Sequence, residues 1–284
     1  MLNHFIKYHS LGNDFIIFDC YKKPLFYVDA ALQRDTWSQF VRDLCGRHTG
    51  VGADGVLIIK SAQGSGAPEM VIFNADGSSA AMCMNGLRCV AHYLVGHYGF
   101  ADEFVVHVGD HIARCSAERY ADSLLITTKI SHYAYQGIKH IKTDEGSFDG
   151  HQVWVGNPHV VIFEQTHLDW LAAHGHLLER HALFPQRTNV EFVWLEHNNE
   201  QTCNHQASYS MLVYERGCGI TQACSSGAAA TLVALVQTGA LAVGDQVALC
   251  MPGGMVQGKI DEHSDIVLVA PAQLVFKGEL PKDE

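Results

Sequence analysis

Two heptads of the same pattern lie almost half a chain apart. CMNGLRC begins at Cys83 and CSSGAAA begins at Cys224, and each has cysteine first and glycine fourth. Their offset is close to half of the 284 residues. A match at such an offset indicates an internal duplication. The sequence therefore predicts two halves of similar design, each with one cysteine in the same place.

The predicted secondary structure also recurs in both halves. Runs rich in Ile, Val and Phe, bounded by Gly, Asn or Asp, predict strands. Apolar residues at helical spacing predict helices over 37–44, 87–95 and 167–178, and another after Cys224. The chain is long enough, and with 48% hydrophobic residues apolar enough, for one large or two ordinary domains. We expect a mixed α/β fold.

Polar stretches and glycine-rich turns suggest where the chain is divided. The stretches 127–136 and 142–150 are the weakest points and are candidates for a domain boundary. Gln63–Pro68 is rich in glycine, but no helical pattern follows it, so it predicts a hairpin loop and not a phosphate-binding loop.

Each heptad cysteine is predicted to lie at or just before a helix N-terminus. The N–H groups and the positive dipole end there stabilise a thiolate, and they also bind carboxylates or phosphates. A buried cysteine that acts as a small hydrophobic residue is the alternative for either position alone. Because Cys83 and Cys224 recur in equivalent settings, the pair indicates a site.

Composition excludes several classes of function. A net charge of −11 argues against nucleic acid or an anionic membrane as the main partner. Nine cysteines, an odd number with no zinc-type spacing, predict reduced thiols and no metal site. The histidines at 174, 176 and 181 fit a solvated helix face better than a metal site. The N-terminus has no apolar core of a signal peptide, so we expect a cytoplasmic protein.

Two acid/base groups of one kind suit the inversion of a stereocentre. One cysteine acts as thiolate base on one face of a carbon, and the other returns a proton to the opposite face. The weakly acidic α-proton of an amino acid requires stabilisation of the charge that develops on the α-carboxylate, which two helix N-termini can provide. Such chemistry needs no pyridoxal phosphate or nicotinamide, and we expect no cofactor.

Eight motifs, in order and over essentially the whole chain, resemble diaminopimelate epimerases. They are LGNDF (11–15), GADG (52–55), FNADGS (73–78), MCMNGLRC (82–89), GNPHVV (156–161), RTNVEFV (187–193), ERGCGITQAC (215–224) and MPGG (251–254). The resemblance implies a cofactor-independent homodimer that interconverts LL- and meso-diaminopimelate on the way to lysine and peptidoglycan. It also implies two pseudo-symmetric domains, each a mostly antiparallel sheet wrapped around a central helix. The active site is expected in the cleft between them, and the last strand is expected to return to the first domain. We expect domains over 1–128 with 271–284, and over 129–270.

The resemblance also assigns roles to individual residues. It implies that Cys83 and Cys224 are the acid/base pair, and that His159 and Glu215 tune the two thiols. The residues that it implies for substrate binding are Asn13, Asn74, Met84, Asn85, Asn157, Asn189, Glu215, Arg216, Ser225 and Ser226. Of these, Arg216 suits a two-pronged grip on a carboxylate.

Four positions depart from the family pattern. Met84 and Ser225 follow the two cysteines where glycine is usual, Ile220 replaces an acidic residue, and Ser10 replaces a glycine. Two other hypotheses stand beside the epimerase. One is a racemase or epimerase of another amino acid, which Met84 favours and Arg216 with Asn74 and Asn189 disfavours. The other is a thiol redox or ligand-binding protein that uses the pair Cys83 and Cys224 as a switch.

Overall fold

The chain forms two compact units, of which the second interrupts the first. A computed structural model describes residues 3–22, 36–80, 82–100, 103–109, 111–120, 123–196 and 207–281. Unit 1 comprises Met1–Thr128 and Ala270–Glu284, and unit 2 comprises Lys129–Val269. The first candidate boundary, 127–136, contains this junction. The second, 142–150, is instead the turn and the first residues of an antiparallel hairpin.

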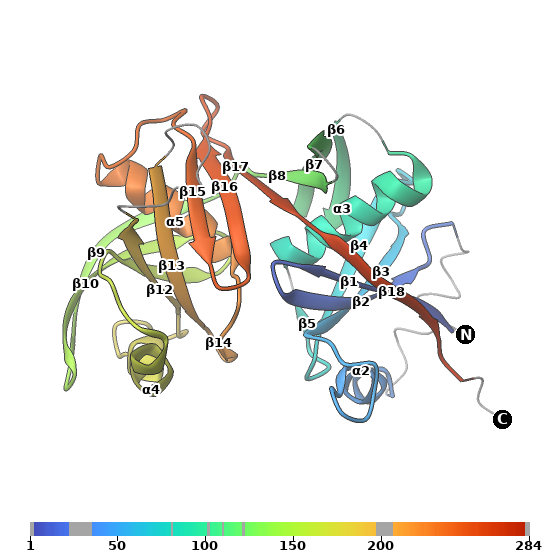
Figure 1. The fold of residues 1–284 in the computed structure, drawn as a ribbon, viewed down its shortest axis with the longest axis horizontal. Coiled ribbons are helices and arrows are strands. Elements are labelled where there is room, and N and C mark those ends of the chain that lie inside the picture. Colours follow the sequence, from blue (N-terminus) through green and yellow to red (C-terminus); the bar gives the residue numbers. More distant parts are fainter. Residues whose placement is uncertain are drawn as a thin grey trace. The chain divides into compact units, whose positions relative to one another are not determined.

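Unit 1 is built from strands around one long helix (Figure 1). Its strands are β1 (His4–Ser10), β2 (Asn13–Asp19), β3 (Gly55–Ser61), β4 (Pro68–Asn74), β5 (Ser79–Ala80), β6 (Glu103–Val108), β7 (His111–Tyr120), β8 (Ser123–Ile130) and β18 (Gln273–Glu279), and its helices are α2 (Trp37–Cys45) and α3 (Met84–Tyr98). β8 runs past the unit boundary by two residues.

The sheet of unit 1 is mostly antiparallel. β1 pairs antiparallel with both β2 and β18, so the last strand returns to the first, as expected. β2 and β3 are parallel, β3 and β4 form the predicted hairpin, and β6 and β7 are antiparallel. Helix α3 buries Leu87, Val90 and Leu94 completely against these strands, because these residues share one helical face. The helix α2 side chains Val41 and Leu44 pack with β2 and β3 in a second cluster.

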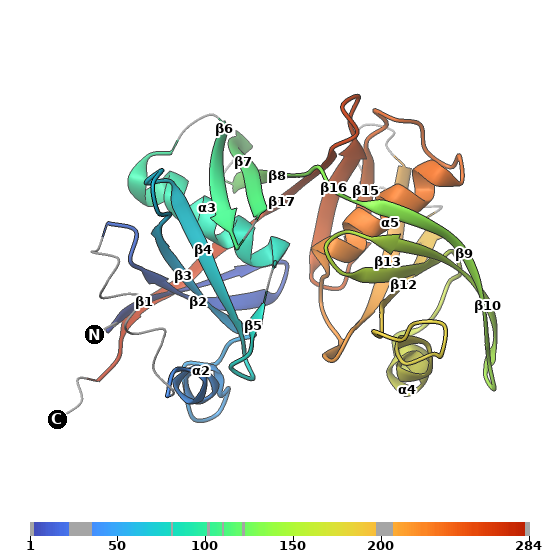
Figure 2. The same ribbon diagram turned by 180° about the vertical axis from the view of Figure 1, so that it is seen from behind.

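Unit 2 repeats the arrangement. Its strands are β9 (Ala134–Thr143), β10 (Gly146–Trp154), β11 (Pro158–Ile162), β12 (Asn189–Leu195), β13 (Ala207–Glu215), β14 (Gly219–Ile220), β15 (Val247–Met251), β16 (Gly254–Ile260) and β17 (Ile266–Pro271), and its helices are α4 (Leu168–Glu179) and α5 (Ser225–Gln237). Helix α5 is apolar along its length and lies against β9 to β12 and β16, which curve around it (Figure 2). It is the central helix of unit 2 as α3 is of unit 1.

The corresponding strands of the two units pair in the same register. In each, a parallel pair of strands is followed by a strand antiparallel to the second of the pair, and the central helix comes later. β2, β3 and β4 correspond in this way to β11, β12 and β13. The equivalent residues, unit 1 first, are Phe15 and His159, Gly55 and Asn189, Leu57 and Glu191, and Asn74 and Glu215. This register confirms the repeat that the heptads predicted.

Candidate active site

Both heptad cysteines lie where the sequence placed them. Cys83 is the N-cap of α3, and its Sγ accepts a hydrogen bond from the backbone N–H of Gly86 at 3.4 Å. Cys224 is the N-cap of α5, and its Sγ accepts from the N–H of Gly227 at 3.3 Å. Each thiol therefore takes the place of the usual Ser or Asp cap of a helix.

A close approach to a neighbouring strand explains why the fourth residue of each heptad is glycine. A Cβ on Gly86 would lie 3.1 Å from a methyl group of Leu57, and a Cβ on Gly227 would lie 2.7 Å from Oε1 of Glu191. In both units the central helix begins against the middle strand of the three, at equivalent residues. The two contacts differ chemically, because one is with an apolar side chain and the other with a carboxylate.

Ionisable side chains surround Cys224. Glu215, at the end of β13, accepts a hydrogen bond from Thr221 Oγ1 at 2.6 Å and another from the Cys224 thiol. Burial raises the pKa of Glu215, and the nearby Glu191 adds to this effect, whereas Thr221 and His159 oppose it. Cys224, Glu215, His159 and Glu191 together are called the Cys224 half-site below.

The surroundings of Cys224 disfavour the thiolate form of its side chain. Burial, followed by the charges of Glu215 and Glu191, raises the pKa of Cys224 well above its usual value. Hydrogen bonds from Ser226 and Gly227 lower it by less. For Cys224, burial and two carboxylates thus oppose the thiolate that a helix N-terminus favours.

His159 is held at both ring nitrogens. Its Nδ1 lies 2.6 Å from Oε1 of Glu191, and its Nε2 lies 2.9 Å from Oδ1 of Asn157. The side chains of His159 and Glu191 are both fully buried. The structure thus brings His159, Asn157, Glu215 and Cys224, which the sequence singled out, into one cluster within unit 2.

Asn189 and Arg216 lie beside this cluster. The buried Asn189 accepts the backbone N–H of Arg216 at 2.9 Å and donates to the carbonyl of Pro158 at 2.8 Å, so its amide fixes two loops. The Arg216 side chain is exposed, and among the described residues its guanidinium makes a long contact of 3.4 Å to the carbonyl of Gln186. Its guanidinium is accessible to an anion.

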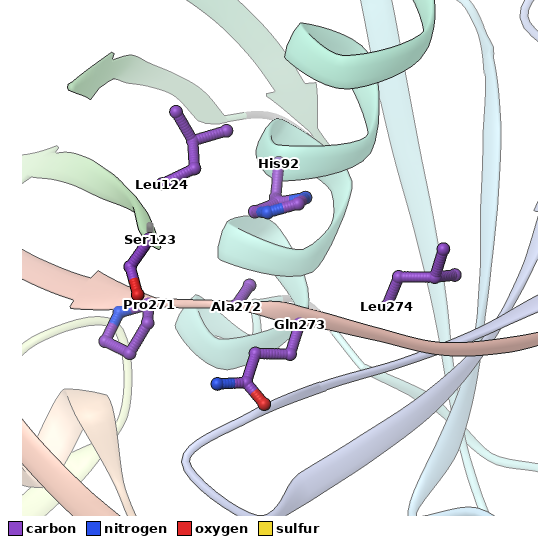
Figure 3. A pocket seen from close by; sticks show the side chains of 7 residues that line it. All are labelled: His92, Ser123, Leu124, Pro271, Ala272, Gln273 and Leu274. Atoms are coloured by element: carbon purple, nitrogen blue, oxygen red, sulfur yellow. The ribbon is translucent and has the colours of Figure 1, made fainter. Parts of the chain in front are cut away.

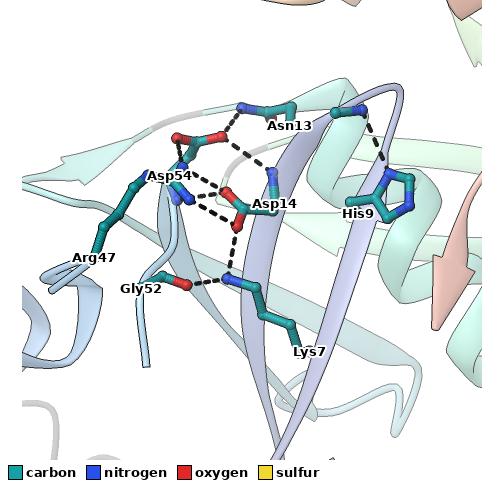
Figure 4. Close-up of polar contacts among 8 residues, drawn as sticks. Lys7, His9, Asn13, Asp14, Arg47, Gly52 and Asp54 are labelled. Atoms are coloured by element: carbon teal, nitrogen blue, oxygen red, sulfur yellow. Dashed lines mark hydrogen bonds and ion pairs between the residues drawn. The ribbon is translucent and has the colours of Figure 1, made fainter. Parts of the chain in front are cut away.

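In unit 1 a charged network fixes Asn13 (Figure 4). Asn13 Nδ2 donates to Oδ2 of Asp54 at 3.0 Å, and Arg47 bridges Asp54 and Asp14 at 2.6 and 2.8 Å. The nearly buried Lys7 lies 2.7 Å from Asp14 and donates to the carbonyl of Gly52. Burial alone would raise the pKa of Asp14, but hydrogen bonds from Arg47 and Lys7 hold it well below its usual range.

The remaining predicted residues line the starts of the helices and the turn after β4. Asn74 donates to Ser78 Oγ at 3.0 Å. Met84 and Asn85 are buried in the first turn of α3, and Asn85 accepts from Arg88. Ser225 and Ser226 form the first turn of α5, and Ser226 Oγ lies 3.4 Å from Cys224 Sγ.

Sequence reasoning missed Glu191 and the partners of Asn13. Glu191 stands in the run NVEFVWL, where one acidic residue interrupts an otherwise apolar strand. Such a residue is expensive to bury unless it has a partner, and this was the available signal. Nothing in the spacing of Asp14, Arg47 and Asp54 indicated that they meet.

A separate cavity lies in unit 1 (Figure 3). It has a volume of about 320 Å³ and is lined by His92, Ser123, Leu124, Pro271, Ala272, Gln273 and Leu274. It contains none of the predicted site residues. Among the described residues, no three His, Cys, Asp or Glu side chains gather as a metal site. In the same part of the chain, no helix is both long and apolar enough to span a membrane.

Comparisons with known proteins agree on one family. A family model described as diaminopimelate epimerase matches residues 5–112 and 152–275. The protein named diaminopimelate epimerase from Thermosynechococcus vestitus is 35% identical, covering 98% of this chain and 99% of its own. The protein of the same name from Bacteroides thetaiotaomicron is also 35% identical, covering 97% of each chain.

Solved structures support the fold. A hydroxyproline epimerase from Agrobacterium vitis, with bound trans-4-hydroxy-L-proline, matches with a TM-score of 0.71 over 98% of this chain and 90% of its own, at 12% identity. A phenazine biosynthesis protein of the PhzF family from Bacillus anthracis matches with a TM-score of 0.73 over 99% of each chain, at 11% identity. The two-unit architecture is therefore shared by proteins of very different sequence.

Proposed function

This chain belongs to the diaminopimelate epimerase family, and we propose that it moves the α-proton of diaminopimelate between the thiols of Cys83 and Cys224. It is an isomerase of lysine biosynthesis that acts on a small amino-acid substrate. The observation that carries the proposal is the matched position of the two cysteines, each the N-cap of its unit's central helix.

The reaction needs one group on each face of the α-carbon. One cysteine removes the α-proton as thiolate, and the other delivers a proton as thiol, with the roles exchanged in the reverse direction. As the proton leaves, negative charge spreads into the α-carboxylate. We propose that first-turn N–H groups stabilise this charge, those of Met84 and Asn85 on α3 and of Ser225 and Ser226 on α5. This chemistry needs no cofactor.

His159 and Glu215 are proposed to set the protonation state of Cys224. Glu215 already accepts a hydrogen bond from this thiol. A carboxylate in this position favours the thiol form, which is the state that delivers a proton. Cys224 then takes the acid role first, and it takes the base role when the substrate has the opposite configuration at this carbon.

The other end of the substrate carries a second amino-acid group. We propose that Arg216 binds its carboxylate through a two-pronged contact, since its guanidinium is exposed at the edge of the Cys224 half-site. Amide groups supply the remaining hydrogen bonds for the amine and carboxylate, and the residues proposed for this are Asn13, Asn74, Asn157 and Asn189.

We further propose that the protein is a cytoplasmic homodimer. Nine cysteines, an odd number, suit a reducing compartment. Strand β18 exposes Leu274, Val275 and Phe276 in succession, each between 45% and 52% accessible. Three large apolar side chains in a row on one strand support contact with a second copy.

Proton exchange at the α-carbon tests the mechanism. Wild-type protein in heavy water should introduce deuterium at the α-carbon of diaminopimelate, detected by mass spectrometry. Cys83→Ala and Cys224→Ala should each abolish epimerisation while circular dichroism stays unchanged. Cys250→Ala is the control and should retain activity, because Cys250 lies on β15, where its Sγ is 3.5 Å from Ser208 Oγ. Near wild-type turnover of either N-cap variant would refute the two-thiol mechanism.

A further inference from the structure

Glu179 places a buried carboxyl group at the end of helix α4. It is the last residue of the helix, and its side chain is only 1% exposed. The C-terminal end of a helix carries a partial negative charge that disfavours an acidic side chain, and burial disfavours it further. The stability of α4 alone therefore does not account for Glu179, so its contacts outside the helix must be considered.

Both oxygens of the Glu179 carboxyl group have donors. Oε2 accepts a hydrogen bond from Nε of the neighbouring Arg180 at 2.9 Å. Oε1 accepts from the backbone N–H of Gly217 at 3.2 Å, and it lies 3.6 Å from Nη1 of Arg187. The backbone carbonyl of Glu179 also accepts from the N–H of Thr188 at 3.1 Å. One residue thus joins the end of α4 to the loop before β12 and to the turn after β13.

The turn after β13 is held at two consecutive backbone N–H groups. The N–H of Arg216 donates to Oδ1 of Asn189 at 2.9 Å, and the N–H of Gly217 donates to Glu179. An exposed arginine side chain has many rotamers, so the position of its backbone decides which groups it can reach. Asn189 and Glu179 together fix the backbone from which the Arg216 side chain extends.

The loop before β12 has an unusual backbone conformation at Arg187. Its φ is 59°, in the left-handed region that few residues other than glycine adopt. Glu179 contacts this loop twice, through Oε1 at the Arg187 guanidinium and through its carbonyl at the N–H of Thr188. The long contact of Arg216 Nη1 is with Gln186 of the same loop. Glu179 therefore joins the loop and the turn on their buried side, and Arg216 meets the loop on the exposed side.

A glycine lets α4 approach β13 closely enough for these contacts. A Cβ on Gly175 would overlap the ring of Tyr214 on β13. Gly175 and Glu179 are four residues apart and therefore lie on one face of the helix. Because this face packs against β13, Glu179 lies next to the turn that follows the strand.

We propose that Glu179 is a positioning residue for Arg216, because it holds Gly217 and the loop before β12 and so fixes where the Arg216 side chain begins. Glu215 is held independently, since it pairs with Gly219 in the ladder of β13 and β14. Loss of Glu179 should therefore weaken substrate binding and leave the proton-transfer step nearly unchanged. Only this effect on catalysis rests on the proposed function. The anchoring of the turn is a property of the protein by itself.

Two substitutions remove the anchoring in steps. Glu179→Met is similar in length and has no acceptor for the Gly217 N–H. Its former donors are on exposed residues and can bind water instead, so the variant is expected to fold. Glu179→Gln keeps one side-chain oxygen for the donors that now share two, and it should give a smaller effect of the same kind.

Nuclear magnetic resonance tests the anchoring directly. Protein labelled with ¹⁵N-glycine is recorded in ¹H–¹⁵N spectra, and the Gly217 signal is assigned by its loss in Gly217→Asn, since asparagine tolerates a left-handed backbone. In Glu179→Met the Gly217 N–H should exchange with water about tenfold faster than in wild type. The N–H of Gly244, which donates to the carbonyl of Ile260 at 2.8 Å, is the reference and should keep its wild-type rate.

Steady-state kinetics supplies the second measurement. Glu179→Met should raise KM for diaminopimelate about tenfold and leave kcat within about twofold, and Glu179→Gln should raise KM less. Glu164→Gln, an exposed change in the same unit, is the matched control and should change neither constant. A merely structural role would lower the melting temperature without changing KM or the exchange of Gly217 relative to Gly244.

The outcomes separate this inference from the proposed function. Unchanged exchange of Gly217 in Glu179→Met overturns the inference, whatever the activity, and so does faster exchange with an unchanged KM. If Glu179→Met does not fold, wild-type exchange and wild-type KM in Glu179→Gln overturn it instead. If the wild-type protein exchanges no α-proton while Gly217 exchange depends on Glu179, the proposed function fails and the anchoring stands.

Discussion

Asp54 fixes the orientation of the Asn13 side chain. Asn13 Nδ2 donates to Oδ2 of Asp54 at 3.0 Å, and Arg47 holds the other oxygen of the same carboxylate at 2.6 Å. One N–H of the Asn13 amide is therefore occupied, and the orientation of the amide is fixed. Its oxygen can accept a hydrogen bond from an ammonium group, and its second N–H can donate to a carboxylate.

The first prediction concerns this network. Asp54→Asn keeps the size of the side chain but supplies one acceptor where two are needed, so the orientation of Asn13 is no longer fixed. KM for diaminopimelate should rise about tenfold, equivalent to about 1.4 kcal/mol of lost binding, and kcat should change less. Steady-state kinetics measures both. Asp144→Asn, an exposed change in unit 2, serves as control. An unchanged KM in Asp54→Asn counts against a binding role of Asn13.

The second prediction is a loss of stability in acid that depends on Asp14. Although burial opposes it, Arg47 and Lys7 hold the pKa of Asp14 below its unfolded value. A depressed folded pKa contributes stability that is present above the unfolded pKa and is lost as the pH falls toward the folded pKa. Urea unfolding should therefore show wild type losing stability below about pH 4, and Asp14→Asn losing less over the same interval. Parallel pH curves for the two proteins would exclude Asp14 as the cause.

The third prediction explains one departure from the family pattern. Ser10 Oγ donates to the carbonyl of Pro271 at 2.8 Å and accepts from Nε of the fully buried Arg88 at 3.0 Å. Ser10→Gly restores the usual family residue but removes both bonds. We expect the free energy of unfolding to fall by about 1–3 kcal/mol, because a buried guanidinium loses an acceptor. Ser65→Gly, in an exposed loop, is the control. Equal stability of Ser10→Gly and wild type would show that the bonds contribute nothing.

Sequence patterns predicted the parts of the site that local structure determines. The N-cap positions of Cys83 and Cys224 followed from heptads whose periodicity is local. The sequence did not indicate Glu191 as a site residue, because its partner His159 lies on another strand. The register between two strands is set by the tertiary structure. The same holds for Ser10 with Arg88. The raised pKa of Cys224 was also beyond the sequence, because burial and two carboxylates from different strands cause it.

Another departure from the family is explained by packing. Ile220, where the family usually has an acidic residue, packs against the apolar cluster of unit 2 that includes Phe192 and Leu171. Its partly buried side chain therefore extends this apolar cluster. Nothing in the structure explains Met84, which is buried in the first turn of α3.

The fourth prediction concerns the choice of substrate. Arg216→Met keeps the length of the side chain and removes its charge, so the distal carboxylate of the substrate loses its binding partner. The value of kcat/KM for diaminopimelate should fall. The fall should correspond to a loss of about 2–4 kcal/mol of transition-state binding if the contact is desolvated. Exchange of the α-proton of alanine, which has no distal carboxylate, should be unaffected and provides the internal control. If the native protein inverts a monocarboxylic amino acid faster than diaminopimelate, and Arg216→Met is harmless, distal recognition is absent.

The fifth prediction compares two glycines in the central helices. Gly227 of α5 lies against Glu191, and an added Cβ would meet Oε1 at 2.7 Å and Cγ at 3.1 Å. Gly96 of α3 has nothing within 4 Å of the same position. Gly96→Ala should therefore raise the free energy of unfolding by about 0.5–1 kcal/mol, the ordinary gain of alanine in a helix. Gly227→Ala should lower it by about 1–3 kcal/mol, because the buried Glu191 side chain must shift to admit the Cβ.

The activity of these two variants carries the decisive comparison. Displacement of Glu191 from His159 should lower kcat in Gly227→Ala well beyond the loss of folded protein, whereas Gly96→Ala should keep wild-type kcat. Both are measured at a temperature where circular dichroism shows each variant fully folded. If Gly227→Ala is as active and as stable as Gly96→Ala, Glu191 is not confined by the start of α5. The close approach of helix and carboxylate would then have no part in holding the imidazole.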